Sequence, residues 1–346
     1  MLAARLHGKE SLKLEEVSVP QINENEALLR VESAFICGTD VRMFKNGYKN
    51  VSPENPLILG HELSGVIKEV GSKVGSLKAG MRVAVAPNMG CGICDLCVSG
   101  NTHLCSDYKA FGISIDGGFA EYTRIPQAAI AQGNVVELSD SISFQEAALA
   151  EPLSCVYNAF ERCDIRPADK VLIIGSGPIG IMHAKLAKSA GASMVIINDL
   201  LEDRLEICKQ ADASFITIAG KDLKDKIMEL TSGKGVDVCI TACPAPSAQE
   251  DSLELMAISG RVLFFGGLPV GTKANLNTNL IHYKQIIVSG TTRASMKQFR
   301  KTLELISSGL VEVKSLVTGS FKIDDFELAL EKASKGRGLK NEVVFI

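Results

Sequence analysis

Four of the chain's ten cysteines lie within one fifteen-residue stretch, CGICDLCVSGNTHLC, and their spacing is typical of a metal site. Cys91, Cys94, Cys97 and Cys105 are separated by two, two and seven residues. Thiolates bind both zinc and iron–sulfur clusters, but bacterial ferredoxins place the fourth cysteine after three residues and follow it with proline. Here Ser106 follows Cys105. The spacing therefore favours zinc over an iron–sulfur electron carrier, and we expect a colourless protein.

The stretch VLIIGSGPIG places three glycines, Gly175, Gly177 and Gly180, after a buried apolar strand and at the start of an amphipathic helix. The first glycine permits a tight turn, the second lets a pyrophosphate approach the backbone, and the third lets helix and strand pack closely. With Pro178 and Ile179, this helix start presents unpaired N–H groups to the phosphates. The pattern predicts a dinucleotide site; the alternative is a glycine-rich turn that binds nothing.

Asp199 ends the next predicted strand, nineteen residues beyond Gly180. A carboxylate at this position accepts hydrogen bonds from the adenosine ribose hydroxyls and repels a 2′-phosphate, which predicts NAD rather than NADP as cofactor. Arg204 softens this preference only secondarily, because it lies one helical turn further along.

Cys37 in FICGTDVRMF and His61 in LILGHELSGVIKEVG carry ligand groups that suit zinc, although neither residue is informative alone. The second stretch resembles the zinc motif of the medium-chain alcohol and polyol dehydrogenases, which is matched at Gly60, His61, Glu62, Gly65 and Gly71. The segment CGTD matches the surroundings of that family's first zinc ligand. Because the glycine loop and the cysteine cluster follow in the family's order, the resemblance covers almost the whole chain.

The resemblance implies that Cys37 and His61 bind a catalytic zinc ion, with Glu62 as a further ligand in the polyol-type branch. Glu151, in AEPLSC, falls where simple alcohol dehydrogenases carry a second cysteine ligand, whereas polyol- and threonine-type members carry glutamate, on the metal or holding its water. The alternatives are a structural partner for Glu62 and, for Glu151, a helix-start carboxylate stabilised by the dipole.

The same resemblance assigns a relay and a second metal. Asp40 is expected to orient His61, and Thr39 matches the hydroxyl relay that carries the substrate proton towards solvent. Zinc with an open position would bind the substrate hydroxyl and lower its pKa, and the nicotinamide would receive the hydride. The clustered cysteines match the family's structural-zinc lobe, residues 88–108, where four thiolates leave no open position. We therefore expect two zinc ions per chain, one catalytic and one structural.

Arg42 departs from the family pattern, because many members have histidine five residues after the zinc cysteine. Arginine stays protonated and cannot act as a base, so the proton leaves by another route or Arg42 serves binding. Together with Lys45 and Lys49, Arg42 suits a phosphorylated polyol, as in the galactitol-1-phosphate branch; the alternative is a solvated basic loop. Arg293, in GTTRAS, is a tentative substrate contact for which a structural salt bridge is the alternative.

The pattern of apolar residues predicts the strands and helices that position these candidate side chains. Residues 1–150 contain short alternating apolar runs cut by glycine, proline and asparagine, which predict strands. Residues 144–170 predict one helix or two. From about 170 to 290, strand and helix patterns alternate, including a helix over 247–260, which predicts a parallel sheet. The tail predicts a helix over 296–310 followed by short strands.

These elements and the resemblance give an α/β fold class with two domains. We expect a GroES-like, barrel-type catalytic domain in residues 1–150, a Rossmann doubly wound parallel-sheet domain in 151–290, and a return to the catalytic domain in 291–346. The length of 346 residues also favours two domains.

The composition limits the possible partners and compartment. The net charge of −3, without long runs of one sign, disfavours nucleic-acid binding, including a zinc module of that kind. No signal-peptide core and no membrane-length apolar run is present. We therefore expect a cytoplasmic protein with a small-molecule substrate, and the family resemblance implies a homo-oligomer, tetramer or dimer.

The sequence thus predicts a zinc- and NAD-dependent dehydrogenase acting on a secondary alcohol of a polyol. A threonine- or butanediol-type enzyme of the same family is the alternative. A crystallin-like protein that binds dinucleotide without catalysis is disfavoured, because such relatives typically lack the zinc ligands that this chain keeps.

Overall fold

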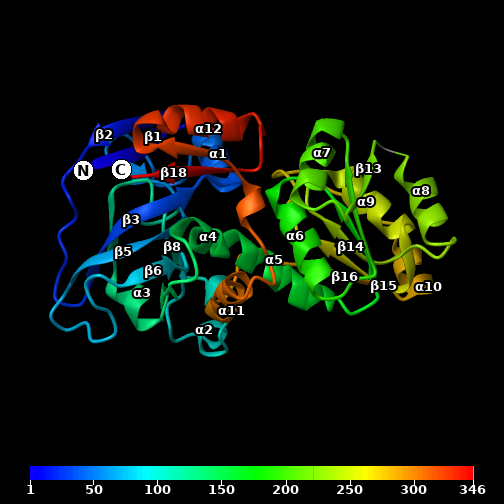
Figure 1. Cartoon of the computed structure of the whole chain (residues 1–346), viewed down its shortest axis with the longest axis horizontal. Helices are drawn as coiled ribbons and strands as arrows, with labels where there is room; N and C mark the ends of the chain where they lie inside the picture. Colours follow the sequence, from blue (N-terminus) through cyan, green and yellow to red (C-terminus); the bar gives the residue numbers. More distant parts are fainter. Residues whose placement is uncertain (221, 346) are drawn as a thin grey trace. The chain divides into compact units, whose positions relative to one another are not determined.

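The computed structural model describes residues 1–220 and 222–345, which form two compact units. The first unit combines Met1–Ser154 with Ala294–Ile346, and the second is Cys155–Arg293. The first unit is therefore built from two separate parts of the chain, coloured blue to green and orange to red in Figure 1. In the described residues, no helix has both the length and the apolar character needed to cross a membrane.

The first unit is rich in strands, as the sequence predicts. Its main sheet has the order β10-β6-β5-β3-β18-β17, with β9 also paired to β3, and a second sheet has the order β2-β1-β4. The strands are β1 (Leu2–Gly8), β2 (Ser11–Glu16), β3 (Ala27–Phe35), β4 (Leu57–Ile58), β5 (Glu62–Val70), β6 (Arg82–Val85), β7 (Asn88–Met89), β8 (Lys109–Ala110), β9 (Tyr122–Ile125), β10 (Val135–Glu137), β17 (Val317–Lys322) and β18 (Lys340–Val344).

Helices are shorter in this unit and lie between or beside the strands. They are α1 (Gly38–Asn46), α2 (Asp95–Val98), α3 (Gln127–Ala131), α4 (Phe144–Ala148), α11 (Met296–Ser307) and α12 (Phe326–Ser334), with the 3-10 helices η1 (Thr102–Leu104), η2 (Lys314–Leu316) and η3 (Ile323–Asp325). Helix α5 (Ala150–Cys163) begins in the first unit and ends in the second. The stretch predicted as one helix or two is thus two, and α12 lies where only short strands were expected.

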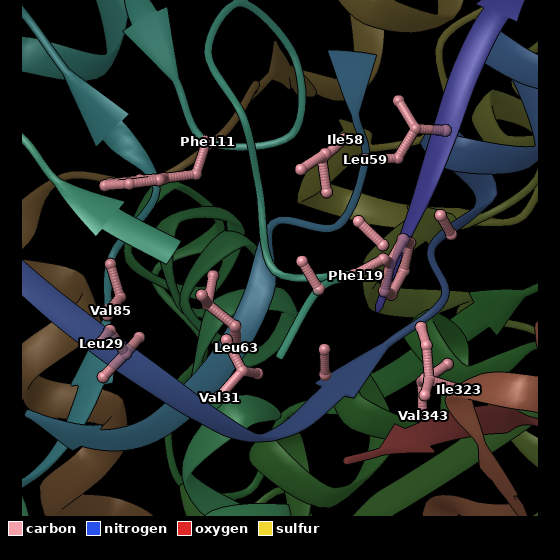
Figure 2. Close-up of a cluster of buried hydrophobic side chains, with 14 of the residues drawn as sticks. Leu29, Val31, Ile58, Leu59, Leu63, Val85, Phe111, Phe119, Ile323 and Val343 are labelled. Atoms are coloured by element: carbon pink, nitrogen blue, oxygen red, sulfur yellow. The ribbon is translucent and has the colours of Figure 1, made fainter. Parts of the chain in front are cut away.

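The core of the first unit joins its N-terminal and C-terminal parts. Figure 2 shows Leu29 and Leu63, from the paired strands β3 and β5, in one cluster with Phe119 and with Ile323 and Val343 from the C-terminal part. The rings of Phe119 and Phe326 meet edge to face, with centroids 4.8 Å apart. Because these side chains are buried, the hydrophobic effect holds residues 294–345 onto the N-terminal strands.

The second unit contains a parallel sheet with the order β13-β12-β11-β14-β15-β16. Counted along the chain this is the 3-2-1-4-5-6 order of a Rossmann fold, and the order reverses at β11, between β12 and β14. The strands are β11 (Lys170–Ile174), β12 (Met194–Asp199), β13 (Ile216–Ala219), β14 (Val236–Thr241), β15 (Met256–Phe264) and β16 (Ile287–Gly290), and the helices are α6 (Pro178–Ser189), α7 (Glu202–Ala211), α8 (Leu223–Leu230), α9 (Pro246–Glu254) and α10 (Thr278–Lys284). Helices cover this sheet in Figure 1.

The helix predicted over 247–260 is wrong in its second half. Helix α9 ends at Glu254, and β15 begins at Met256, which pairs with Val236 of β14. Leucine and methionine at helical spacing favoured helix locally, but pairing with the neighbouring parallel strand decides the conformation. Helix α10 was not predicted.

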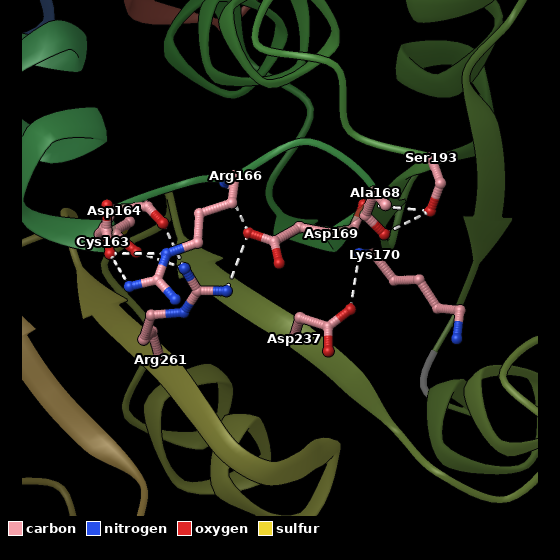
Figure 3. Close-up of polar contacts among 9 residues, drawn as sticks. All are labelled: Cys163, Asp164, Arg166, Ala168, Asp169, Lys170, Ser193, Asp237 and Arg261. Atoms are coloured by element: carbon pink, nitrogen blue, oxygen red, sulfur yellow. Dashed lines mark hydrogen bonds and ion pairs between the residues drawn. The ribbon is translucent and has the colours of Figure 1, made fainter.

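A polar network joins α5, β11 and β15 at the end of the parallel sheet where β11 begins. As Figure 3 shows, Arg261 donates to Asp169 Oδ2 at 2.8 Å and to the carbonyl oxygens of Cys163 and Asp164. The side chains of Arg261 and Asp169 are only 13% and 12% exposed. Asp237 accepts a hydrogen bond from the Lys170 amide at 2.8 Å. Because nucleotide sites in such sheets lie at the opposite, carboxyl ends of the strands, we interpret this network as structural.

Replacing Arg261 by methionine is expected to lower the free energy of unfolding by about 3 kcal/mol, because Asp169 and two carbonyl groups lose a charged donor in a shielded position. Chemical denaturation followed by circular dichroism measures this loss. Arg166→Met is the control, because Arg166 and its partner Asp164 are 66% and 60% exposed and the variant should leave stability unchanged. Equal effects of the two variants would contradict the assignment.

Candidate functional site

The pairing of β3 with β5 brings Cys37 and His61 together. Phe35 at the end of β3 is opposite Glu62 at the start of β5, so Cys37 and His61, which lie just outside these strands, become neighbours. One ligand atom from each of Cys37, His61 and Glu62 lies within 4.8 Å of the others. His61 and Glu62 are buried and Cys37 is half-buried. Residues from two separate segments of the sequence therefore form one compact cluster.

Glycines near His61 allow the backbone segments to approach closely enough to form this cluster. A Cβ atom on Gly117 would lie 2.1 Å from the Gly60 carbonyl oxygen, and one on Gly65 would lie 2.0 Å from the Arg30 carbonyl oxygen. Gly60 itself has a φ of +94°, in the region that favours glycine. The glycines in the zinc-like motif thus have a structural reason for their positions beside His61.

Asp40 lies behind the cluster and is completely buried. It accepts hydrogen bonds from the Cys37 amide at 2.8 Å and the Gly60 amide at 3.4 Å, and its Oδ1 lies 3.5 Å from His61 Nδ1. Burial acts to lower the pKa of His61, but the charges of Asp40 and Cys37 raise it well above 6.5. The surroundings of His61 therefore attract positive charge, as a metal-ligand cluster must.

The cluster also contains a buried acceptor, Oε1 of Glu62, that no protein donor satisfies. Glu62 is 0% exposed, and its Oε1 makes no hydrogen bond. An unpaired buried carboxylate oxygen is costly unless a cation compensates it. A thiol, an imidazole and this carboxylate together fit a zinc ion.

Glu151 lies in the first turn of α5 and is 7% exposed, but it is not part of the three-residue cluster. Its predicted place on the metal stays a prediction. Thr39 and Arg42 lie beside the cluster in α1, where an Arg42 guanidinium N–H donates to Thr39 Oγ1 at 3.0 Å. Lys45 donates to the Ser334 carbonyl oxygen at 3.4 Å. The hydroxyl of Thr39 is thus held by a group that cannot accept a proton.

Lys340 is a member of this site that the sequence did not reveal. It is 4% exposed at the first position of β18, and its ammonium pairs with Glu62. The visible signal in the sequence was a lysine at the start of a buried C-terminal strand pattern, GLKNEVVFI. Its partner could not be identified, because it depends on which strand β18 joins.

The four clustered cysteines surround a space of zinc-site dimensions. The Cys91–Cys97 and Cys94–Cys105 Sγ atoms are 3.9 and 3.8 Å apart, and all four Sγ atoms lie within 4.8 Å of one another. Zinc–sulfur bonds of about 2.3 Å in a tetrahedron require sulfur separations of about 3.8 Å. A Cβ atom on Gly90 would lie 2.4 Å from Cys97 Sγ, so glycine is needed beside the cluster. The arrangement fits a closed four-thiolate zinc site.

The glycine loop follows β11, at the point where the strand order of the parallel sheet reverses. Gly175 has a φ of +111°, a Cβ on Gly177 would meet nothing within 4 Å, and one on Gly180 would lie 1.9 Å from the Gly175 carbonyl oxygen. Gly175 thus lies in the turn, Gly177 leaves the backbone open to approach, and Gly180 allows close packing, in the predicted order. Pro178 and Ile179 begin α6, whose first turn follows this loop.

Asp199 ends β12 and holds the glycine loop in place. Its Oδ2 accepts hydrogen bonds from the Ser176 amide at 2.9 Å and the Ser176 hydroxyl at 2.6 Å. Burial acts to raise the pKa of Asp199, but the hydrogen bonds from Ser176 lower it below 3.8, so the group is an anion at neutral pH. Its charge also interacts with Arg204 in α7. The Ser176 contact was not anticipated from the sequence.

Arg293 is exposed and ends the second unit, with a φ of +56°. Its carbonyl oxygen accepts a hydrogen bond from Asn158 Nδ2 at 2.9 Å. Its predicted role in substrate binding stays a prediction.

A β-rich unit with a thiolate–imidazole–carboxylate cluster, joined to a dinucleotide-type parallel-sheet unit, defines a zinc-type alcohol dehydrogenase. Residues 23–136 match the alcohol dehydrogenase GroES-like domain, and residues 178–308 match the zinc-binding dehydrogenase domain. The chain therefore belongs to the zinc-binding medium-chain dehydrogenase family and is an oxidoreductase.

Individual relatives agree with this assignment. The chain is 35% identical to a sorbitol dehydrogenase of Bacillus subtilis over 99% of this chain and 95% of the relative. It is 33% identical to an L-threonine 3-dehydrogenase of the same species over 94% and 92% of the two chains. A solved Escherichia coli alcohol dehydrogenase (rspB), complexed with NADH, superimposes with a TM-score of 0.89 and 25% identity, covering 100% of this chain and 99% of that one.

Proposed function

We propose that this oxidoreductase uses zinc and NAD to oxidise a secondary hydroxyl group of a polyol such as sorbitol, xylitol or arabitol. The observation that carries the proposal is the buried cluster of Cys37, His61 and Glu62 with its unpaired carboxylate oxygen. The 35% identity to a sorbitol dehydrogenase over nearly the full length supports the polyol class. Threonine and butanediol remain the alternative substrates, given the similarity to a threonine dehydrogenase.

The residues of the cluster have separate tasks in this proposal. Cys37 and His61 hold the metal, and buried Asp40 fixes the orientation of His61. When bound there, zinc supplies Lewis-acid polarisation of the substrate hydroxyl. Thr39 Oγ1 accepts one N–H from Arg42, so its own hydrogen stays available for donation and its second lone pair can receive the substrate proton. Glu62 and Glu151 offer the nearby carboxylates through which water can carry the proton away.

The substrate class is tested by an NAD-reduction screen with sorbitol, xylitol, arabitol, galactitol, threonine, butanediol and primary alcohols. We expect the highest kcat/KM with a polyol. Activity confined to primary alcohols would contradict the polyol proposal, and a preference for threonine or butanediol would select the alternative.

A phosphorylated polyol is a second candidate, favoured by the position of Arg42. Its guanidinium is held beside Thr39, two residues from Cys37, where a phosphate on a bound substrate would be within its reach. The screen therefore includes free and phosphorylated forms of the same polyol. If phosphate brings no gain in kcat/KM, or if Arg42→Met loses no more activity on the phosphorylated form than on the free form, this candidate is excluded.

Replacing Asp199 by alanine is expected to lower kcat/KM for NAD by about 10- to 100-fold and to raise the relative use of NADP, because a charged acceptor is lost and repulsion of a 2′-phosphate ends. Steady-state kinetics with both cofactors measure this. Ser176→Ala removes the hydroxyl bond to Asp199 but keeps the carboxylate, so it separates loop support from cofactor recognition. A cofactor preference unchanged in Asp199→Ala would contradict the role of this residue.

We also propose that the chain forms a homo-oligomer through the edge of its parallel sheet. Strand β16 is last in the sheet order, and Ile287 at its start is 60% exposed. Two copies can extend one sheet by pairing such edges. Light scattering should give a multiple of 37.0 kDa, and Ile287→Lys should lower that mass. We propose a reducing compartment such as the cytoplasm, because no disulfide joins any of the cysteines in the residues that the structure describes.

A further inference from the structure

Lys340 places a buried positive charge directly against the catalytic cluster. Its ammonium forms an ion pair with Glu62 Oε2, donates to the Ile36 carbonyl oxygen at 3.3 Å and lies 5.7 Å from the centre of the Phe35 ring. The side chains of Lys340 and Glu62 are 5% and 0% exposed. Two oppositely charged groups have thus been removed from water together.

Strand pairing fixes this position. Strand β18 runs antiparallel to β3, with Glu342 opposite Phe35, and the Ile36 amide donates to the Asn341 carbonyl oxygen at 3.0 Å. Lys340, the residue before Asn341, therefore lies beside the segment that leads from β3 to Cys37. Because this backbone is hydrogen-bonded on a buried strand, Lys340 has little freedom to move away from Glu62.

The charges around Lys340 are mostly negative. Burial acts to lower the pKa of Lys340, but the charges of Glu62, Cys37 and Glu151 raise it above 10.5. Lys340 is thus a cation that faces the same anionic groups that a metal ion would bind. A metal ion and an ammonium group compete for the charge of one carboxylate whenever both are close to it.

The two oxygens of Glu62 have different surroundings. Both oxygens are buried without a hydrogen bond of regular geometry, but only Oε2 forms an ion pair with Lys340. A carboxylate held this way can offer one oxygen to a metal while the other remains with the ammonium. Its electron density is shared, so it should bind the metal more weakly than a free carboxylate would.

We propose that Lys340 is a positioning residue that keeps Glu62 a weak, displaceable ligand of the catalytic zinc. By holding Oε2, Lys340 leaves Glu62 only one oxygen for the metal, so that the carboxylate does not also occupy the position that the substrate hydroxyl needs. The inference rests on the proposed zinc site at Cys37, His61 and Glu62. The proposal predicts that loss of the Lys340 charge makes metal binding tighter. Loss of a simple structural support would make metal binding weaker.

The first test compares Lys340→Met, which removes the charge at similar volume, with Lys340→Arg, which keeps it. Purified holoenzymes are treated with a chelator, and zinc release is followed with a metal-sensitive dye. We expect the catalytic zinc to leave Lys340→Met at least about 10-fold more slowly, because Glu62 then binds it fully. Lys340→Arg should behave like the unchanged protein. Equal or faster release from Lys340→Met would overturn the proposal.

The second test asks whether Lys340 acts through Glu62. Cobalt replaces the catalytic zinc, and its visible absorption reports the number and type of its ligands. The spectrum should change in Lys340→Met and should not change when the same substitution is made in a Glu62→Gln protein. A spectral change that persists without the Glu62 carboxylate would contradict the proposed route. Lys340→Gln provides a second neutral variant if Lys340→Met does not fold.

Failure of the metal site itself is recognised separately. If Cys37→Ser still retains two zinc ions per chain, the proposed catalytic site is wrong. If Cys37→Ser loses one zinc ion but the Lys340 variants show no slower release, only the role of Lys340 is wrong. The proposal also expects a lower kcat for Lys340→Met. The rate of zinc release, and not kcat, decides the test.

Discussion

Substitution of Cys37 by serine is expected to lower kcat/KM for the alcohol by about 1,000-fold and to remove one zinc ion per chain. Cys37 contributes the softest ligand of the buried cluster, and its Sγ lies within 4.8 Å of ligand atoms of His61 and Glu62. Loss of Lewis-acid stabilisation worth about 4 kcal/mol in the transition state corresponds to a factor of this size. A serine hydroxyl has nearly the same shape but is a poor zinc ligand.

Zinc analysis, steady-state kinetics and thermal denaturation of the same preparation measure the three parts of this prediction. The melting temperature should change little, because Cys37 lies outside the hydrophobic cluster of Figure 2. Cys163→Ala is the matched control: burial raises the pKa of this thiol to about 12, and it should keep both metals and full activity. Turnover by Cys37→Ser within tenfold of the unchanged protein would refute the catalytic assignment.

Substitution of Cys97 by serine should give the opposite result, a large loss of stability with little loss of chemistry per folded chain. Cys97 is 8% exposed, and its Sγ lies 3.9 Å from that of Cys91 within the four-thiolate cluster. Structural zinc contributes directly to folding free energy, and the lobe around it has few buried apolar side chains of its own. We expect a loss of about 4 kcal/mol, which lowers the melting temperature of a unit this size by roughly 10 °C.

The two cysteine variants are distinguished by the metal that remains. Cys97→Ser should retain one zinc ion per chain, and that ion should support catalysis at low temperature. Ser106→Ala, one residue beyond the cluster, is the control and should change neither metal content nor melting temperature. Two zinc ions in Cys97→Ser, or an unchanged melting temperature, would contradict a structural role for the lobe.

The sequence predicts those features that depend on neighbouring residues. The turn, the open position and the close contact expected at the three glycines of the loop are present in the structure, because turn, helix start and strand end are all encoded within ten residues. The Cys91–Cys105 cluster was equally local. Cys37 and His61, by contrast, were uninformative alone, and only the family resemblance singled them out before β3 and β5 were seen to pair.

Features that depend on distant pairing were missed or misjudged. Lys340 could not be assigned to Glu62, because nothing local indicates that β18 joins β3. The second half of the predicted helix over 247–260 is a strand because β14 offers a partner edge to Met256. Helix α12 packs on the core through Phe326, a tertiary contact that local propensity does not report.

The order of the chain also has a consequence for synthesis on the ribosome. Strand β18 pairs with β3, yet the whole of the second unit is translated between them. During elongation the second unit can fold as soon as it emerges, whereas in the first unit residues 33–35 of β3 must wait for β18, although β9 can already pair with residues 27–30. The catalytic cluster thus lacks its buried ammonium group until residue 340 leaves the exit tunnel. Nascent chains are therefore expected to remain inactive until β18 has emerged and paired with β3.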